Sequence, residues 1–208
     1  MSAFLGKIHY WLYDKIKLHE NLIQGMVILA ENKGYKCETL IDESYLKYGE
    51  PITGSLENEI EHANIHGWLQ QRIISVESRL AYVVTELINK GIVSKEEIAD
   101  VFYQNGEKIA NQNQIIETVP QNLFNMIFDY MLEGMPCDRV NEIIENNEEI
   151  ISWRTTRDLH KDYWTSVGGD INNFYYFRDL WINGFLEAGG SEYRYIRTED
   201  ELNIIRRD

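Results

Sequence analysis

Residues 56–90 read LENEIEHANIHGWLQQRIISVESRLAYVVTELINK, and the fold class that we predict follows from this stretch. Its apolar side chains recur at intervals of three and four residues, which is the period of an amphipathic α-helix. Ser55 can cap the start of such a helix, and Gly91 can end it. We therefore predict one long helix with an apolar stripe made of Leu69, Ile73, Val76, Leu80, Val83, Val84 and Leu87.

The same period runs through residues 3–32 and predicts a second long helix, which Ser2 can cap and Gly34 can end. Further along the chain, Ser94 and Glu97 form a capping box, the pattern of a helix start. The remaining expected elements are mostly helices, over residues 95–112, 121–133, 148–164 and 170–188, with a short helix capped by Asp138 before the third of these. We also expect a short extended segment over Tyr193–Ile196 and a terminal helix opened by a second capping box from Thr198 to Glu201.

These elements predict an all-α protein, a helical bundle framed by two long antiparallel helices with shorter helices in the C-terminal part. We divide the chain into an acidic helical bundle over residues 1–134 and an aromatic-rich helical region over residues 135–208. The second part is expected to pack on the first as one compact unit, because 208 residues suit one domain or two closely packed parts.

Charge narrows the choice of partners. The chain carries 20 basic and 34 acidic side chains, a formal net charge of −14. We expect no nucleic-acid partner, because proteins that bind DNA or RNA displace counterions with lysine and arginine. No apolar run reaches the roughly 18 residues that a membrane helix needs. The two cysteines make no disulfide framework and the N-terminus has no signal-peptide pattern, which favours the cytoplasm.

Histidines form the constellation with the clearest chemical meaning. On a helical wheel, His62 and His66 fall near the centre of the apolar arc of residues 56–90, and Glu59 lies at its flank. His19 falls at the centre of the apolar arc of the helix over residues 3–32. If the two long helices are antiparallel neighbours, His19, His62 and His66 lie at the same height. Histidines four residues apart suit zinc, and Glu-x-x-His suits di-iron bundles. This predicts a site for zinc, iron or manganese with the ligands His19, Glu59, His62, His66 and His160.

A second interpretation of the same histidines needs no metal. Buried imidazoles bonded to tyrosine, serine or carboxylate groups can form a polar layer that sets helix register. The alternative function is then a non-enzymatic acidic interaction protein: a regulator, or an immunity-type or phage-type inhibitor of a basic partner, met through complementary charge. Enzymatic activity is left open, although the sequence has no Walker A loop, GxGxxG, GxSxG or paired CxxC motif.

Aromatic residues gather between residues 153 and 195, where arginines are interleaved with them. Four aromatics in a row, Phe174 to Phe177, cannot all point inward from one helix, because successive residues turn by about 100°. Two interpretations are open for this region. It is either a core seam between the C-terminal region and the bundle, or a surface for a partner or for self-association.

Overall fold

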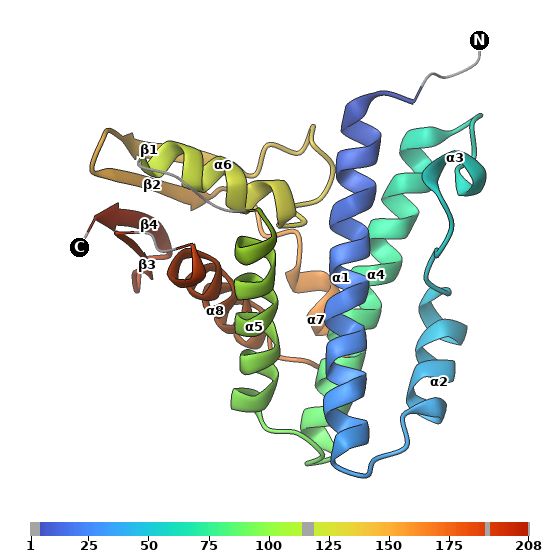
Figure 1. The fold of residues 1–208 in the computed structure, drawn as a ribbon. Helices are drawn as coiled ribbons and strands as arrows, with labels where there is room; N and C mark the ends of the chain where they lie inside the picture. The colour runs from blue at the N-terminus through green and yellow to red at the C-terminus, as the bar shows by residue number, and fades with distance from the viewer. Residues whose placement is uncertain (1–4, 114–118, 190–191, 208) are drawn as a thin grey trace. The chain divides into compact units, whose positions relative to one another are not determined.

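The computed structural model describes residues 5–113, 119–189 and 192–207 (Figure 1). The chain forms two compact units that interleave along the sequence. The first unit takes in the chain up to Ser94 and the two later segments Leu132–Pro136 and His160–Asp170. The second unit takes in Lys95–Met131, Cys137–Leu159 and Ile171–Asp208.

The regular elements described in the first unit are helices. They are α1 (Lys7–Asn32), α2 (Glu38–Tyr48), α3 (Leu56–Glu59), α4 (Ile65–Asn89) and α7 (Lys161–Ser166). The two long helices, α1 and α4, pack against each other, and α2 packs on α4. Their shared core is apolar, with Met26, Leu69, Val76 and Leu80 fully buried. The helix predicted over residues 3–32 is confirmed from Lys7 to Asn32 as α1, with Gly6 rather than Ser2 at its N-cap, and the predicted start at residues 2–4 lies outside the described residues.

Helices α1 and α4 run in the same direction, so the predicted antiparallel frame is wrong (Figure 1). Near the first turns of both helices, the ring centroids of Tyr13 and Trp68 lie 6.2 Å apart. Further along both, Arg79 pairs with Glu20. The reason is α2, which occupies the connection and carries the chain back to the end where α1 began. A connection without this helix would reverse the chain only once and make the two long helices antiparallel.

The single helix predicted over residues 56–90 is interrupted. Helix α3 ends at Glu59, residues 60–64 are not helical, and α4 begins at Ile65. Asn64 caps α4, because its side-chain oxygen accepts a hydrogen bond of 3.2 Å from the Gly67 amide. Such a cap satisfies an amide that the first helical turn leaves unpaired. The apolar period therefore identifies α4 from Leu69 onward, but it does not extend to residues 60–64.

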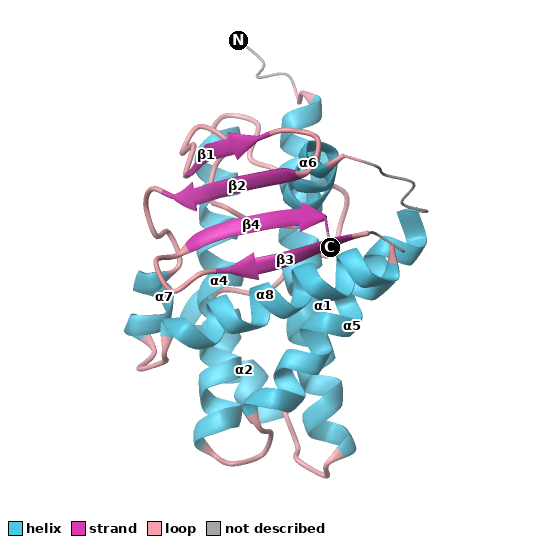
Figure 2. Cartoon of the chain, turned by 90° about the vertical axis from the view of Figure 1, so that its left-hand side faces the viewer, coloured by secondary structure: helices cyan, strands magenta, loops and turns pink. Residues whose placement is uncertain are grey.

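The second unit combines helices with a sheet, so the all-α prediction is wrong and the fold is mixed α/β. Its strands pair antiparallel in the order β1-β2-β4-β3, and Figure 2 shows them side by side with helices of this unit behind them. The elements are α5 (Lys95–Asn113), α6 (Pro120–Tyr130), α8 (Ile171–Ala188), β1 (Asn141–Asn146), β2 (Ile150–Thr155), β3 (Tyr193–Arg197) and β4 (Leu202–Arg207).

Three segments predicted as helices contain strands of the sheet, and β1 stands where the short helix after Asp138 was expected. In β2, the fully buried Ile151 and Trp153 point to one side, while Arg154 is exposed. Ser152 between them is buried as well, so burial in β2 does not follow a clean period of two, and its apolar residues also fit a helical stripe. Similarly, β4 replaces the expected terminal helix. The extended segment expected over Tyr193–Ile196 is confirmed as part of β3.

The second capping box forms a hairpin turn rather than a helix start. The Thr198 amide donates to the Leu202 carbonyl at 2.9 Å, and the Leu202 amide donates to Thr198 Oγ1 at 3.1 Å. Glu201 takes the left-handed conformation, with φ of 63°. A threonine hydroxyl bonds nearby backbone in turns as well as in caps. The pattern alone therefore does not distinguish the two structures.

The aromatic residues of the second unit form much of its core. Trp153, Phe177, Trp181 and Phe185 are fully buried, and the rings of Phe102 and Phe177 stack with centroids 5.3 Å apart. This agrees with packing as the role of the aromatic run. In the part of the chain that the structure describes, no helix has the length and apolar character that crossing a bilayer requires.

Candidate functional site

The predicted ligands from the start of the second long helix lie at the surface. Glu59 and His62 are exposed, and His62 lies in the turn before α4. His66 is exposed in the first turn of α4 and faces His9 of α1, with the two Nε2 atoms 3.3 Å apart. Partial burial and the neighbouring His66 both lower the pKa of His9. The parallel course of α1 and α4 explains this pairing, because it places His9 rather than His19 beside His66.

The other two predicted ligands are buried and share a neighbour, Glu77 of α4. His160, just before α7, has its Nδ1 atom 3.2 Å from Glu77 Oε1 and its Nε2 atom 3.8 Å from Glu133 Oε2. Both His160 and Glu77 are at most 2% exposed. Burial alone would lower the pKa of His160, but Glu77 and Glu133 raise it by more, so that the pKa is about 10. The imidazole is therefore a cation held between two carboxylates.

His19 belongs to the same buried cluster, but its environment favours the neutral imidazole. It is 7% exposed, and its Nδ1 atom donates a hydrogen bond of 3.0 Å to the Lys15 carbonyl. Burial lowers the pKa of His19, and Glu77 opposes that shift only in part. The cluster thus contains one neutral imidazole from α1, one imidazolium next to α7, and a carboxylate of α4 close to both.

The five predicted metal ligands do not come together at one site in the described structure. Among residues 5–113, 119–189 and 192–207, no group of three or more histidine, cysteine, aspartate or glutamate side chains is arranged to hold a metal ion. His19 and His160 are brought into one cluster, whereas Glu59, His62 and His66 lie elsewhere at the surface. A metal ligand must be a neutral imidazole, and His160 is protonated across the neutral range. Metal binding by these residues stays a prediction without support from their arrangement.

The first unit also contains a pocket of about 480 Å³, a volume within the range of ligand sites. Its walls come from the second half of α1, from the start and middle of α2, and from the segment before α3. Arg79 of α4 is the one lining residue from that helix. Tyr45, Ile41, Val27 and Ile23 supply apolar and aromatic surface in the same walls.

An ion pair is built into the wall of this pocket. Arg79 is only 2% exposed, and its guanidinium holds both carboxylate oxygens of Glu20, with Nη1 donating to Oε2 at 2.7 Å. The Arg79 guanidinium carbon also lies 5.8 Å from the centre of the Tyr45 ring. Two-point pairing fixes the orientation of both side chains. Because Glu20 neutralises Arg79, the pair adds no net charge to the pocket.

Three further carboxylates line the pocket, and they leave it negative. Glu31, Glu38 and Asp42 are exposed and make no ion pair with any described residue. The buried thiol of Cys37, in the same wall, responds to this charge. Burial raises its pKa, and Glu31 and Glu38 raise it further. The pocket therefore combines a negative rim with a rigid polar wall and an aromatic ring.

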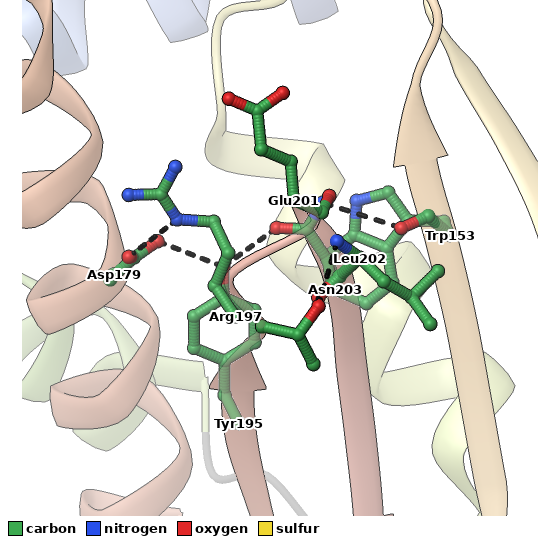
Figure 3. A network of polar contacts seen from close by, with 8 residues as sticks. Trp153, Asp179, Tyr195, Arg197, Glu201, Leu202 and Asn203 are labelled. Atoms are coloured by element: carbon green, nitrogen blue, oxygen red, sulfur yellow. Dashed lines mark hydrogen bonds and ion pairs between the residues drawn. The ribbon is translucent and has the colours of Figure 1, made fainter.

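The second unit holds a separate polar network beside its sheet (Figure 3). The Tyr195 hydroxyl lies 2.8 Å from both Asp179 Oδ1 and Asn203 Oδ1, and Arg197 Nε donates to Asp179 Oδ2 at 2.9 Å. A phenol has one proton and can donate to only one of those oxygens. Burial raises the pKa of Asp179, and the neighbouring Arg197 and Tyr195 oppose that shift. The network closes with Asn203 Nδ2 donating to the Trp153 carbonyl at 3.3 Å and ties α8 to β3, β4 and β2.

Sequence reasoning missed the residues that matter most in the first unit. Glu77 and Arg79 lie within the apolar run of α4 and are buried, but neither is among the site residues predicted from the sequence. Charged residues between Val76 and Leu80 were a usable signal, since buried charges are nearly always paired. Their partners, Glu133 and Glu20, had no signal of their own in the sequence.

Comparison with models of protein families, with curated proteins and with solved structures finds no match to this chain.

Proposed function

We propose that this protein is a non-enzymatic binding protein that receives a cationic side chain of a basic protein partner in the pocket between α1 and α2. The observation that carries the proposal is the combination of a cavity of about 480 Å³ with three carboxylates that no described cation neutralises. Arginine and lysine side chains are the cationic groups that a basic partner presents to such a cavity.

The wall of the pocket favours a guanidinium or ammonium over a neutral guest. Glu31, Glu38 and Asp42 attract positive charge, and at about 4 Å each contact contributes on the order of 1 kcal/mol in water and more where solvent is excluded. Tyr45 adds a ring face on which a cation gains about 0.5–2 kcal/mol. Arg79 is committed to Glu20 and so does not repel the incoming charge.

The overall charge supports the same class of partner. A formal charge of −14 steers basic proteins toward the molecule and speeds their encounter, mostly at low ionic strength. Steering by itself has no preferred site. The pocket supplies a site, because its walls combine exposed carboxylates with a concave surface and an aromatic side chain.

The test is binding of a fluorescein-labelled tetra-arginine peptide, followed by fluorescence anisotropy at about 50 mM and about 300 mM salt. We expect the Glu38→Gln/Asp42→Asn variant to weaken binding by about 10-fold at the lower salt, since two contacts of about 0.7 kcal/mol each are lost. The matched control is Asp14→Asn/Glu61→Gln, which removes the same charge from exposed positions outside the pocket. It should change affinity less than twofold.

Equal losses in the two variants would mean that the peptide responds to net charge alone, and the pocket would then not be the site. No detectable binding of the peptide by the unmodified protein at low salt would contradict the proposal directly.

A further inference from the structure

Two histidines lie in the first turns of helices that begin side by side. Helices α1 and α4 run parallel, so their N-terminal ends lie together (Figure 1). His9 is the third residue of α1 and His66 is the second residue of α4, and their Nε2 atoms are 3.3 Å apart. The N-terminal end of a helix carries partial positive charge. The two imidazoles therefore face each other at a place where both helices disfavour a further positive charge.

His9 also caps its own helix. The Gly6 amide donates a hydrogen bond of 2.9 Å to His9 Nδ1, which is the bond of a capping box in which the side chain at the third helical position reaches back to the N-cap amide. Glutamate or glutamine usually occupies that position and accepts through a side-chain oxygen. An imidazole accepts only through a nitrogen that carries no proton. The cap of α1 therefore depends on the protonation state of His9.

The two hydrogen bonds at this pair fix where its protons are. The pair has four ring nitrogens. The Gly6 bond needs a bare Nδ1 on His9, and the contact between the two Nε2 atoms needs one bare nitrogen and one N–H. Two neutral rings satisfy both bonds in one way, with the His9 proton on Nε2 and the His66 proton on Nδ1. A third proton leaves one bare nitrogen, so one of the two hydrogen bonds must break.

We propose that His9 and His66 form a proton-sensitive latch, which holds the first turns of α1 and α4 together while both rings are neutral and releases them when the pair gains a proton. The added proton removes a hydrogen bond and places a positive charge beside the positive ends of two helices. The release is confined to the first turns, because Leu12 and Leu69 are buried three residues further along each helix.

The groups around the pair do not compensate such a charge. The charged and titratable side chains close to it in the chain are Lys7 on α1, Glu57 and Glu59 on α3, and Glu61 and His62 in the turn before α4. Glu57 accepts a hydrogen bond of 2.7 Å from the Tyr10 hydroxyl. Burial lowers the pKa of His9, the charge of His66 lowers it further, and no described carboxylate raises it. The neutral pair is therefore the favoured state near neutral pH.

The lowered pKa sets the direction of the pH dependence. The unfolded chain binds the His9 proton at its ordinary pKa of 6.5, whereas the folded chain binds it only at lower pH. A group of this kind stabilises the fold fully above its unfolded pKa and loses that contribution as pH falls through the folded value. The latch is therefore closed near neutral pH and opens on acidification.

The test is nitrogen-15 NMR of the full chain between about pH 7.5 and about pH 4.5. Spectra of the imidazole nitrogens report the tautomer of each ring, and amide exchange, taken relative to the intrinsic rate at each pH, reports the Gly6 bond. At the upper pH we expect His66 in the tautomer with its proton on Nδ1, which free histidine populates less. We expect the protection of the Gly6 amide to fall by about fivefold or more as His9 becomes protonated.

Two variants separate the cap from the facing ring. His66→Ala removes the facing charge but keeps the Gly6 bond, so the pKa of His9 should rise toward 6.5 and the Gly6 amide should still follow it. His9→Ala removes the acceptor, so the Gly6 amide should exchange without protection at every pH. The matched control is His62→Ala, which removes an exposed histidine from the turn before α4 and should leave both measurements unchanged.

A neutral His66 with its proton on Nε2, or a Gly6 amide whose protection is constant while His9 titrates, would overturn the proposal. An unchanged pKa of His9 in the His66→Ala variant would do so as well. The pocket variant Glu38→Gln/Asp42→Asn should leave the titration of His9 unchanged, which separates this inference from the proposed function.

Discussion

His160 illustrates how one side chain can connect distant parts of the sequence. Its two ring nitrogens face Glu77 and Glu133, and all three groups lie in the first unit. Removing one member of a buried ion pair costs about 3–5 kcal/mol, because the remaining charge is left without compensation. We expect His160→Leu to lower the free energy of unfolding by that cost, and we expect the added Glu77→Leu substitution to recover a large part of it. Urea unfolding followed by tryptophan fluorescence measures both.

The same residue predicts how this loss depends on pH. The pKa of His160 is about 10 in the folded chain and near 6.5 when unfolded. A group with a raised folded pKa stabilises fully below its unfolded value and loses that contribution as pH rises through the folded value. The stability difference between the unmodified protein and His160→Leu should therefore be largest below about pH 6.5 and shrink toward pH 10. A difference that grows over that interval would contradict the imidazolium assignment.

In the second unit, α5 and α8 approach each other closely at two glycines. A Cβ at Gly106 of α5 would overlap the Trp181 carbonyl of α8, and a Cβ at Gly184 would overlap the Tyr103 carbonyl of α5. Alanine favours a helix over glycine by about 1 kcal/mol, but here backbone atoms must move apart. We expect Gly106→Ala to destabilise by about 1–3 kcal/mol. Lys108→Ala on the exposed side of α5 should change stability by less than about 0.5 kcal/mol in the same urea titration.

At the scale of the whole molecule, the two units cannot be separated by one cut in the chain. The first unit uses Leu132–Pro136 and His160–Asp170, which lie between segments of the second. A fragment of residues 1–94 would keep Glu77 but lose His160, Glu133 and α7. We expect this fragment to lack a cooperative urea transition by circular dichroism, although its helices have strong local signals. A transition at the midpoint of the full chain would contradict that expectation.

Local information in the sequence was enough for most helices. The apolar period of α1 and of α4 after Leu69, and the capping residues of α5, depend on contacts within a few residues, which the sequence lists in order. The buried state of His19 and His160 was also predictable from their place among apolar neighbours. These features come from the sequence by itself because helical hydrogen bonds and side-chain periodicity are local properties.

Only the tertiary structure decided the sheet, the direction of α4 and the composition of the two sites. Strands β2 and β4 pair residues about 50 positions apart, and such pairing leaves only a short period of two in each strand. Because α2 lies between α1 and α4 in the chain, the two long helices are parallel and not antiparallel as predicted. His66 therefore contacts His9 and not His19. Glu77 and Arg79 found partners from other segments for the same reason: a buried charge must be paired, but the sequence does not say by which residue.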